Sequence, residues 1–378
     1  MITEKVKKFT SLYHKVASLN WGIILLVLLI SAMGWGLLTS AAGGDMGPWA
    51  SKQMLRFCVG LVIMFAIALT NLRWWLQFSY IFYGISLLLL CGVEFLGFIG
   101  KGGQRWINLY ILQLQPSELM KIALVLALAR YFHSKPLPPS FSKLLIPFLL
   151  IIVPVLLVLR QPDLGTAMIF ILMGGMLFFV AGVSLWGVFG VFVGTCISLP
   201  LLWTFLHEYQ KKRILIFFDP GQDPLGAGYH ITQSKIALGS GGLWGKGYMQ
   251  GTQASLNFLP EKQTDFIFTL LCEEWGFIGG VFLIILYVFL ILLSFRIVLT
   301  TLNTFGRFVA MGMTAIFSLY VIINIAMVMG LLPVVGIPLP LVSYGGTSLL
   351  TLLMGFGFLL NVGLHRTLKV PSASLGIL

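Results

Sequence analysis

This sequence contains very little charge. Asp, Glu, Lys and Arg make up 10% of its 378 residues, whereas hydrophobic residues make up 58%, and the mean hydropathy is +0.98. Average soluble domains carry about 25% charged residues, so the composition excludes a soluble protein. A membrane-embedded helical bundle is the remaining class, because helices satisfy their backbone hydrogen bonds within the spanning segment.

Cysteine is also scarce. The four cysteines, Cys58, Cys91, Cys196 and Cys272, lie in apolar segments, and none forms a CxxC pattern. The sequence therefore gives no support for a disulfide framework or a metal site, and we expect these side chains to pack among apolar neighbours.

Apolar stretches of bilayer-spanning length run through the whole chain. We predict ten spans, at residues 20–40, 53–70, 75–99, 116–132, 144–159, 164–181, 185–205, 265–299, 306–330 and 344–363. The eighth is long enough for a tilted or extended helix. The first lacks a convincing cleavage site, so we expect it to be retained rather than removed as a signal peptide. The predicted fold is an all-α integral membrane protein, with residues 1–378 in one polytopic domain.

The short connections indicate how the spans are oriented, because Lys and Arg accumulate on the cytoplasmic side. With the N-terminus inside, the inner flanks hold twelve such residues and the outer flanks hold five. The five outer residues are Lys52, Arg56, Lys101, Arg105 and Arg160. Both termini are therefore predicted to be cytoplasmic, and the long 206–263 loop between the seventh and eighth spans is predicted to lie outside. The net charge of +12 then reflects topology and not nucleic-acid binding.

Most polar motifs fall on the outer side in this orientation, which predicts a site at the outer membrane boundary. Asp265 begins the eighth span, directly after Glu261, Lys262 and the expected N-cap Thr264. Ionisable groups at such a position indicate function. Further along, Glu273 and Glu274 are predicted to pair with Arg or Lys on another helix.

Glu118 and Lys121 begin the fourth span, after a Gln-Pro-Ser segment that favours a helix start. Their spacing of three places both side chains on one helix face. Two explanations are open: they form an ion pair that makes a buried helix tolerable, or the cation faces a cavity and binds an anion. We prefer the second, because both residues lie near the outer end of the helix.

Other outer segments also have two explanations. Arg105 either holds a phosphate or anchors the chain at the interface together with Trp106. The Arg160–Asp163 segment is either part of the site or a tight turn with an internal salt bridge. Residues 338–348 form either a re-entrant, non-helical segment that lines a cavity or an ordinary loop. Within the long loop, we predict a short interfacial helix at Tyr229–Leu238 and a flexible, glycine-rich connection at 239–242.

Taken in order, these motifs resemble the SEDS (shape, elongation, division, sporulation) family of bacterial cell-wall membrane proteins. The resemblance runs from about residue 20 to 366. It is carried by Gln104–Trp106, Gln115–Glu118, Gln161–Gly165, Asp219–Pro220, Asp223–Tyr229, Gln233–Ser234, Gly239–Gly242, Leu259–Glu261, Thr264–Phe266 and Val342–Gly346. The segments Gly247–Gln253 and Gly336–Leu341 resemble the elongation branch more than the division branch. Gln263 stands where the family usually has His, so any proton-transfer role of that His is missing or filled elsewhere.

The resemblance implies a peptidoglycan glycosyltransferase of the inner (cytoplasmic) membrane that polymerises lipid II during cell elongation. The implied partner is a class B penicillin-binding protein of the elongation machinery, and the implied fold has ten helices with a lipid-accessible outer cavity. Asp265 is the predicted general base, a role that contributes about 10²–10⁴-fold. The predicted substrate-binding residues are Lys121, Glu118, Arg105, Lys262, Glu261 and Ser343. A divalent cation, Mg²⁺ or Mn²⁺, could share the neutralisation of the diphosphate, although the sequence contains no dedicated metal site.

Alternative functions remain open at this point. A lipid II flippase would also use polar intramembrane residues and broken helices, but the polar motifs cluster on one side and the two halves show no internal repeat. A division-specific paralogue and a non-catalytic scaffold are further alternatives, and a scaffold would leave Asp265 without a role.

Overall fold

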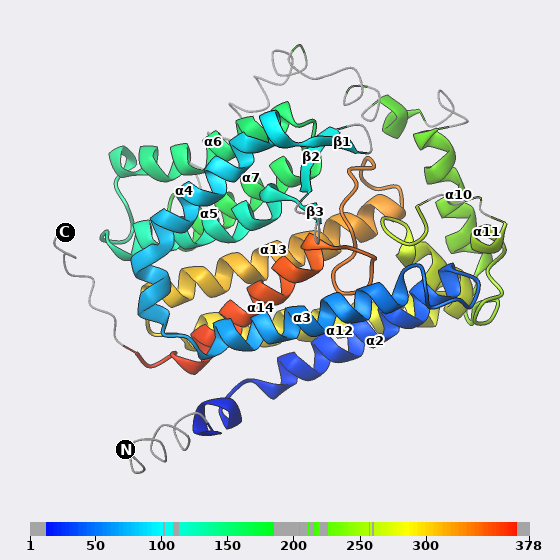
Figure 1. Ribbon diagram of the computed structural model, residues 1–378, viewed down its shortest axis with the longest axis horizontal. Helices are drawn as coiled ribbons and strands as arrows, with labels where there is room; N and C mark the ends of the chain where they lie inside the picture. Colours follow the sequence, from blue (N-terminus) through cyan, green and yellow to red (C-terminus); the bar gives the residue numbers. More distant parts are fainter. Residues whose placement is uncertain are drawn as a thin grey trace.

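The computed structural model describes residues 13–100, 103–108, 113–184, 204, 211, 215–219, 226–256, 258 and 261–368. These residues form a bundle of long helices with a short sheet at one end (Figure 1). The long helices are α2 (Trp21–Ala41), α3 (Ala50–Leu69), α4 (Leu72–Leu96), α5 (Pro116–His133), α6 (Leu145–Arg160), α7 (Leu164–Val180), α12 (Ile267–Thr300), α13 (Thr304–Val328) and α14 (Thr347–Leu364). Strands β1 (Phe98–Gly100), β2 (Gly103–Asn108) and β3 (Gln113–Leu114) pair antiparallel in the order β1-β2-β3.

Nine of the ten predicted spans coincide with these helices, and the predicted span 185–205 lies, except for residue 204, outside the described residues. By length and composition, seven described helices can cross a membrane, which makes the chain a multi-pass membrane protein. Helix α7 is apolar but has only 17 residues. Helix α5 is less apolar because it carries Glu118, Lys121 and Arg130.

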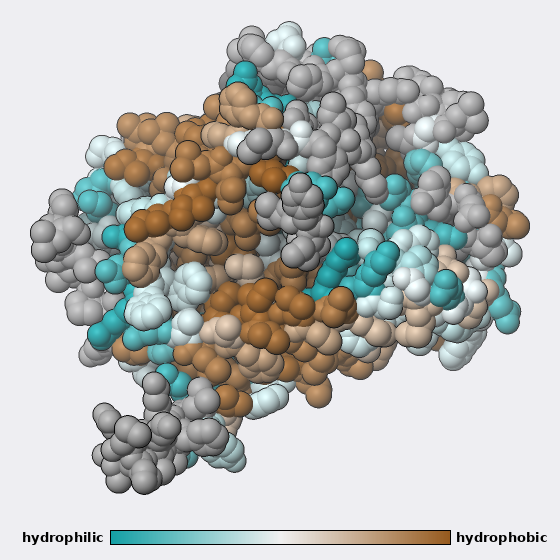
Figure 2. All heavy atoms as spheres, viewed as in Figure 1, coloured by the Kyte–Doolittle hydropathy of each residue, from teal (hydrophilic) through white to brown (hydrophobic). Residues whose placement is uncertain are grey.

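Helix α5 lies at the centre of the bundle. It packs against α4, α6, α7, α13 and α14, and 16 of its 18 residues are buried. Helices α3, α4 and α6 lie further out, and their exposed side chains include Val62, Leu88 and Leu156. The view in Figure 2 accordingly shows a broad apolar area over the helices, with hydrophilic surface gathered toward the right. A helix surrounded by other helices can hold charged side chains that would be costly against lipid.

Helix α12 is broken at Gly276, where φ is +68°. The break removes helical partners from nearby backbone groups, and residues 242–247 replace those partners. The amides of Lys246 and Gly247 donate to the carbonyls of Glu273 and Glu274, both at 3.0 Å. In return, Phe277 and Ile278 donate to the carbonyls of residues 242 and 243, at 2.9 and 3.2 Å. The span predicted at 265–299 is thus present as α12, but it contains a break that a distant loop satisfies.

The glycines before this loop pack tightly against α12. A Cβ on Gly241 would lie 2.0 Å from the carbonyl oxygen of Cys272, and one on Gly245 would lie 2.1 Å from that of Glu274. The prediction of a flexible connection at 239–242 is therefore wrong, because these glycines permit close backbone contact. The predicted helix at Tyr229–Leu238 is confirmed as α10 (Ala227–Ser240), which packs on α12 and α13.

Polar segments gather at one end of the bundle. The sheet, α10 and α11 (Thr252–Ser255) lie toward the end opposite to the start of α2 and the end of α14 (Figure 1). The residues between α13 and α14 also turn at this end. The motifs that the sequence analysis placed on one side of the membrane therefore lie together in the structure.

Candidate functional site

Asp265 lies in a turn that precedes α12, not at the first position of the helix. The turn spans residues 261–266, and α12 begins at Ile267. The hydroxyl of Thr264 donates to Glu261 Oε2 at 2.8 Å and gives α12 no cap. The predicted N-cap is therefore wrong, because the Glu261 carboxylate competes for the Thr264 hydroxyl. The turn leaves Asp265 partly exposed.

The backbone around Asp265 is fixed by three hydrogen bonds from distant residues. Asn324 Nδ2 on α13 donates to the carbonyl of Asp265 at 3.0 Å, and also to that of Ile337 at 2.7 Å. Ser343 Oγ donates to the carbonyl of Thr264 at 2.5 Å. The amide of Tyr344 donates to the carbonyl of residue 263 at 2.8 Å. The segment that follows α13 therefore holds the turn in place.

A glycine turn lies beside the Asp265 carboxylate. Gly336 has a φ of +73°, which favours glycine. A Cβ at this position would lie 3.7 Å from Asp265 Oδ2. Any side chain at residue 336 would therefore lie against the carboxylate.

The segment from 331 to 346 is non-helical and includes most of the predicted segment 338–348, whose last two residues instead begin α14. It is also substantially buried, and its polar backbone groups are satisfied by side chains of neighbouring helices. Gln53 on α3 donates to the carbonyl of Ser343 at 2.9 Å and accepts from the amide of Gly345 at 3.3 Å. Tyr287 on α12 donates to the carbonyl of Pro340 at 2.6 Å. Burial within protein is the condition under which irregular backbone is tolerated at membrane depth.

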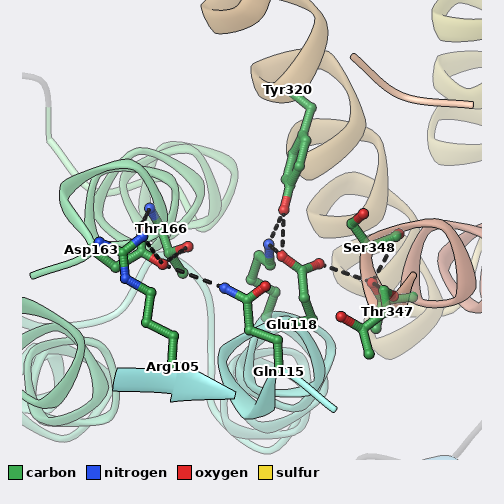
Figure 3. Close-up of polar contacts among 10 residues, drawn as sticks. Arg105, Gln115, Glu118, Asp163, Thr166, Tyr320, Thr347 and Ser348 are labelled. Carbon is green, nitrogen blue, oxygen red and sulfur yellow. Dashed lines mark hydrogen bonds and ion pairs between the residues drawn. The ribbon is translucent and has the colours of Figure 1, made fainter. Parts of the chain in front are cut away.

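Glu118 and Lys121 form a buried ion pair with a distance of 2.6 Å between Oε1 and Nζ (Figure 3). Tyr320 donates to Glu118 Oε1 at 2.9 Å, and Thr351 donates to Oε2 at 2.9 Å. Lys121 also donates to the Tyr320 hydroxyl. A cavity of about 20 Å³ lies beside the pair, which is enough for a water molecule. The ion pair fits the first explanation of these residues, and the cavity fits the second. Anion binding by Lys121 therefore stays a prediction.

Arg105 binds the connection between α6 and α7 (Figure 3). Its Nε donates to the carbonyl of Gln161 at 3.0 Å, its Nη2 donates to the carbonyl of Pro162, and its Nη1 lies 3.8 Å from Asp163 Oδ2. The arginine thus joins β2 to the start of α7. Phosphate binding by Arg105 stays a prediction. To bind a phosphate, the arginine would have to give up some of these contacts.

Asp163 caps α7 by accepting from the amide and the hydroxyl of Thr166, at 3.1 and 3.0 Å. Arg160 instead lies 3.8 Å from Glu94, with 75% of its side chain exposed. The predicted salt bridge within 160–163 is therefore wrong, because Asp163 faces inward as an N-cap while Arg160 faces outward.

Two buried carboxylates lie next to the break in α12. Glu273 Oε1 accepts from Lys246 Nζ at 2.8 Å, from Thr252 Oγ1 at 3.1 Å and from the amide of Gln253 at 3.0 Å. Glu274 accepts from Ser40 on α2. Glu273 is paired as predicted, but its cation comes from the loop and not from another helix. These contacts tie the loop to α12 and α2.

The remaining predicted residues lie in the Asp265 turn or beside it. Burial lowers the pKa of Lys262 from its ordinary value, so its ammonium loses its proton more readily than that of an exposed lysine. Ser343 contacts the turn through the carbonyl of Thr264. Among the described residues, no group of three or more His, Cys, Asp or Glu could hold a metal ion, and binding of a divalent cation stays a prediction.

Sequence reasoning did not single out Gln53, Arg56, Tyr320, Asn324 or Thr351. Tyr320 and Asn324 stand four residues apart in the apolar helix α13, and polar residues within a span are a signal that could have found them. Arg56 was counted only as an outer-flank charge. Its surroundings depend on the packing of α3 against α14.

Comparisons with known proteins place the chain among cell-wall proteins. Residues 12–368 match the FtsW/RodA/SpoVE model, described as "Cell cycle protein". The peptidoglycan glycosyltransferase MrdB of Escherichia coli (strain K12) is 45% identical over 352 residues, or 93% of this chain and 94% of that protein. Among solved structures, a chain described under "Structural coordination of polymerization and crosslinking by a peptidoglycan synthase complex" is 32% identical, with a TM-score of 0.81 and coverage of 93% and 99%. RodA of Thermus thermophilus is 30% identical, with a TM-score of 0.71 and coverage of 93% and 98%.

Proposed function

This chain belongs to the FtsW/RodA/SpoVE (SEDS) family of cell cycle proteins, and on that premise we propose that it is a RodA-type peptidoglycan glycosyltransferase that polymerises lipid II into glycan strands during cell elongation. The activity is that named for relatives which match most of the chain. One observation supports the mechanism most directly. Asp265 lies in a turn that distant residues hold in place, and it is partly exposed at the polar end of the bundle.

Asp265 is the general base in this proposal. The 4-hydroxyl oxygen of one N-acetylglucosamine attacks C1 of a lipid-linked N-acetylmuramic acid, and Asp265 accepts the hydroxyl proton. A new bond forms between that oxygen and C1, while the bond from C1 to the diphosphate oxygen breaks. Direct attack on an α-linked donor inverts C1 and gives a β-1,4 link. One carboxylate is enough, because the diphosphate leaves as an anion and needs no proton.

The other predicted residues support this reaction. Lys121 and Arg105 offset the charge that develops on the diphosphate, after exchanging some of their protein contacts for substrate. Glu118 orients Lys121 through their ion pair. Glu261 and Lys262 flank the base in the same turn, and Ser343 positions that turn. A divalent cation, Mg²⁺ or Mn²⁺, would supply further positive charge.

We also propose the membrane arrangement that the sequence predicted. The chain forms one polytopic domain in the inner membrane, with ten spans, both termini cytoplasmic and residues 206–263 in a large outer loop. Its partner is a class B penicillin-binding protein within the elongation machinery. Support for a partner comes from the structural match to a chain of a peptidoglycan synthase complex, in which polymerisation and crosslinking are coordinated.

Polymerisation of purified lipid II by the wild type and by Asp265→Asn tests this proposal. Both proteins are assayed with the partner and with a penicillin that blocks crosslinking. We expect long strands from the wild type and a loss of at least about 10²-fold in the variant. Asp45→Asn is the matched control, because Asp45 is an exposed acid in the connection between α2 and α3.

Strands from both proteins would remove Asp265 from the mechanism. If neither protein makes strands although the complex with the partner is intact, the polymerase assignment fails, and transport of lipid II across vesicles becomes the assay to perform. A non-catalytic scaffold would give the same absence of strands, and also no transport.

A further inference from the structure

Arg56 on α3 carries a charge that no described carboxylate neutralises. Its guanidinium lies over the ring of Tyr344, with Cζ 4.9 Å from the ring centroid. Its Nη1 is buried and has no hydrogen-bond partner among the described residues. A buried donor without an acceptor is costly, and an anion would supply the missing acceptor.

The guanidinium lies next to the N-terminus of α14. Gly346 is the N-cap of this 18-residue helix. A Cβ on Gly346 would lie 3.8 Å from Arg56 Cζ and 4.0 Å from Nη1. The first amides of a helix lack helical partners and carry partial positive charge, so they attract anions. The arginine and the helix end therefore favour the same kind of ligand.

Thr347, the first residue of α14, supplies a third polar group. It is only 2% exposed, and its hydroxyl has no hydrogen-bond partner within the described part of the chain. In Figure 3, Thr347 lies at the start of the helix, beside Ser348. A hydroxyl that is buried here without a partner points to a ligand that the chain alone does not provide.

The framework around these groups is rigid. Gln53 lies three residues before Arg56 on α3 and bonds the backbone of both Ser343 and Gly345. Further along, a Cβ on Gly60 would lie 2.3 Å from Leu353 Cδ1, so α3 and α14 are in close contact. The start of α14 is thus held against the helix that carries Arg56, which favours a preorganised anion site.

This cluster lies close to the proposed base. Ser343 and Tyr344 contact the Asp265 turn, while Arg56 lies over the ring of Tyr344 and beside Gly346. Ser343 and Gly346 are three residues apart, which spans at most about 10 Å. The Asp265 turn and Arg56 therefore lie against the same short stretch of backbone.

We propose that Arg56, Thr347 and the first amides of α14 bind the diphosphate of the lipid-linked donor sugar. This assignment rests on the proposed glycosyltransferase function and adds a diphosphate site to it. Guanidinium groups bind phosphate oxygens in pairs, and the helix end supplies donors for a second phosphoryl group. Binding here breaks no described ion pair, unlike binding at Lys121 or Arg105.

Direct binding of farnesyl diphosphate tests the assignment without relying on activity. The full chain is placed in nanodiscs of zwitterionic lipid, and the ligand is titrated calorimetrically. We expect Arg56→Gln to weaken binding by about 10- to 100-fold and Arg56→Lys to weaken it less. Gly346→Ala should also weaken binding, because its methyl group would contact the guanidinium. Arg73→Gln, an exposed arginine at the start of α4, should bind as the wild type does.

Equal affinity in the wild type and Arg56→Gln, or no binding to the wild type, would overturn the assignment. If phosphatidylglycerol competes as well as farnesyl diphosphate, the cluster is a phospholipid headgroup site, and the donor assignment is also overturned. Strand synthesis from lipid II separates this inference from the proposed function. If strand synthesis requires Asp265 but ligand binding does not depend on Arg56, only the diphosphate site is rejected. If ligand binding depends on Arg56 but no strands form, only the polymerase function is rejected.

Discussion

Asn324 supports the site by fixing backbone groups, and it takes no direct part in the proposed reaction. It is fully buried on α13, and its Nδ2 joins the carbonyl of Asp265 to that of Ile337. The Asp265 carboxylate therefore depends, for its position, on a side chain that belongs to a different helix. A positional error of about 1 Å can cost about 10²-fold in rate.

We predict that Asn324→Ala lowers the kcat of lipid II polymerisation by about 10- to 100-fold with little change in KM, because the turn loses its anchor while the substrate contacts remain. Steady-state kinetics of the complex with the partner measure both constants. Asn361→Ala is the matched control. Asn361 is equally buried, but it bonds the carbonyls of Ile67 and Thr70. Equal losses of kcat in the two variants would contradict a positioning role for Asn324.

At the scale of elements, α12 and residues 241–247 form one unit. Gly276 interrupts the helix, and the loop occupies the interruption with four backbone hydrogen bonds. Lys246 and Glu273 add a contact of 2.8 Å between their side chains. The two segments can approach this closely because Gly245 and Gly276 have no side chains.

We predict that Gly245→Ala destabilises the fold by about 2–5 kcal/mol, because the positive φ and the crowded backbone both oppose a Cβ. Thermal unfolding of the purified protein in detergent measures the change. Gly239→Ala is the control. Gly239 lies within α10 and would place its Cβ in open space, so we expect no loss of stability there. Unchanged stability in Gly245→Ala would contradict the close contact.

At the scale of the whole molecule, the gathering of polar segments at one end allows a test of orientation. Trp244 is 79% exposed in the loop that packs on α12, and Leu302 is 64% exposed between α12 and α13. The two positions flank opposite ends of the long part of α12.

We predict that a cysteine at position 244 is labelled by a membrane-impermeant maleimide in intact spheroplasts, whereas a cysteine at position 302 is labelled only after permeabilisation. The reason is that the predicted topology places the 206–263 loop outside and residue 302 inside. Both substitutions are made in a variant without the native cysteines. The reverse pattern would overturn the orientation derived from Lys and Arg.

The sequence predicted the helices well because a bilayer-spanning helix is specified by its own apolar residues. Features that depend on contacts between distant segments were missed. The break at Gly276 is filled by a loop about thirty residues earlier. The N-cap was missed for a local reason, because the hydroxyl of Thr264 bonds Glu261 in its own turn and not the helix. Likewise, Asp265 was identified from its local charge, whereas Arg56 gained significance only when packing placed it beside Gly346.

The short stretch from Ser343 to Thr351 has a consequence for repeated synthesis. One end of this stretch bonds the turn of the proposed base, its middle lies against Arg56, and its far end bonds Glu118. A displacement of α14 along its axis would therefore disturb all three contacts at once, and not one without the others. In repeated synthesis, the positions of the proposed base, the proposed diphosphate site and Lys121 would then stay coupled through the start of one helix.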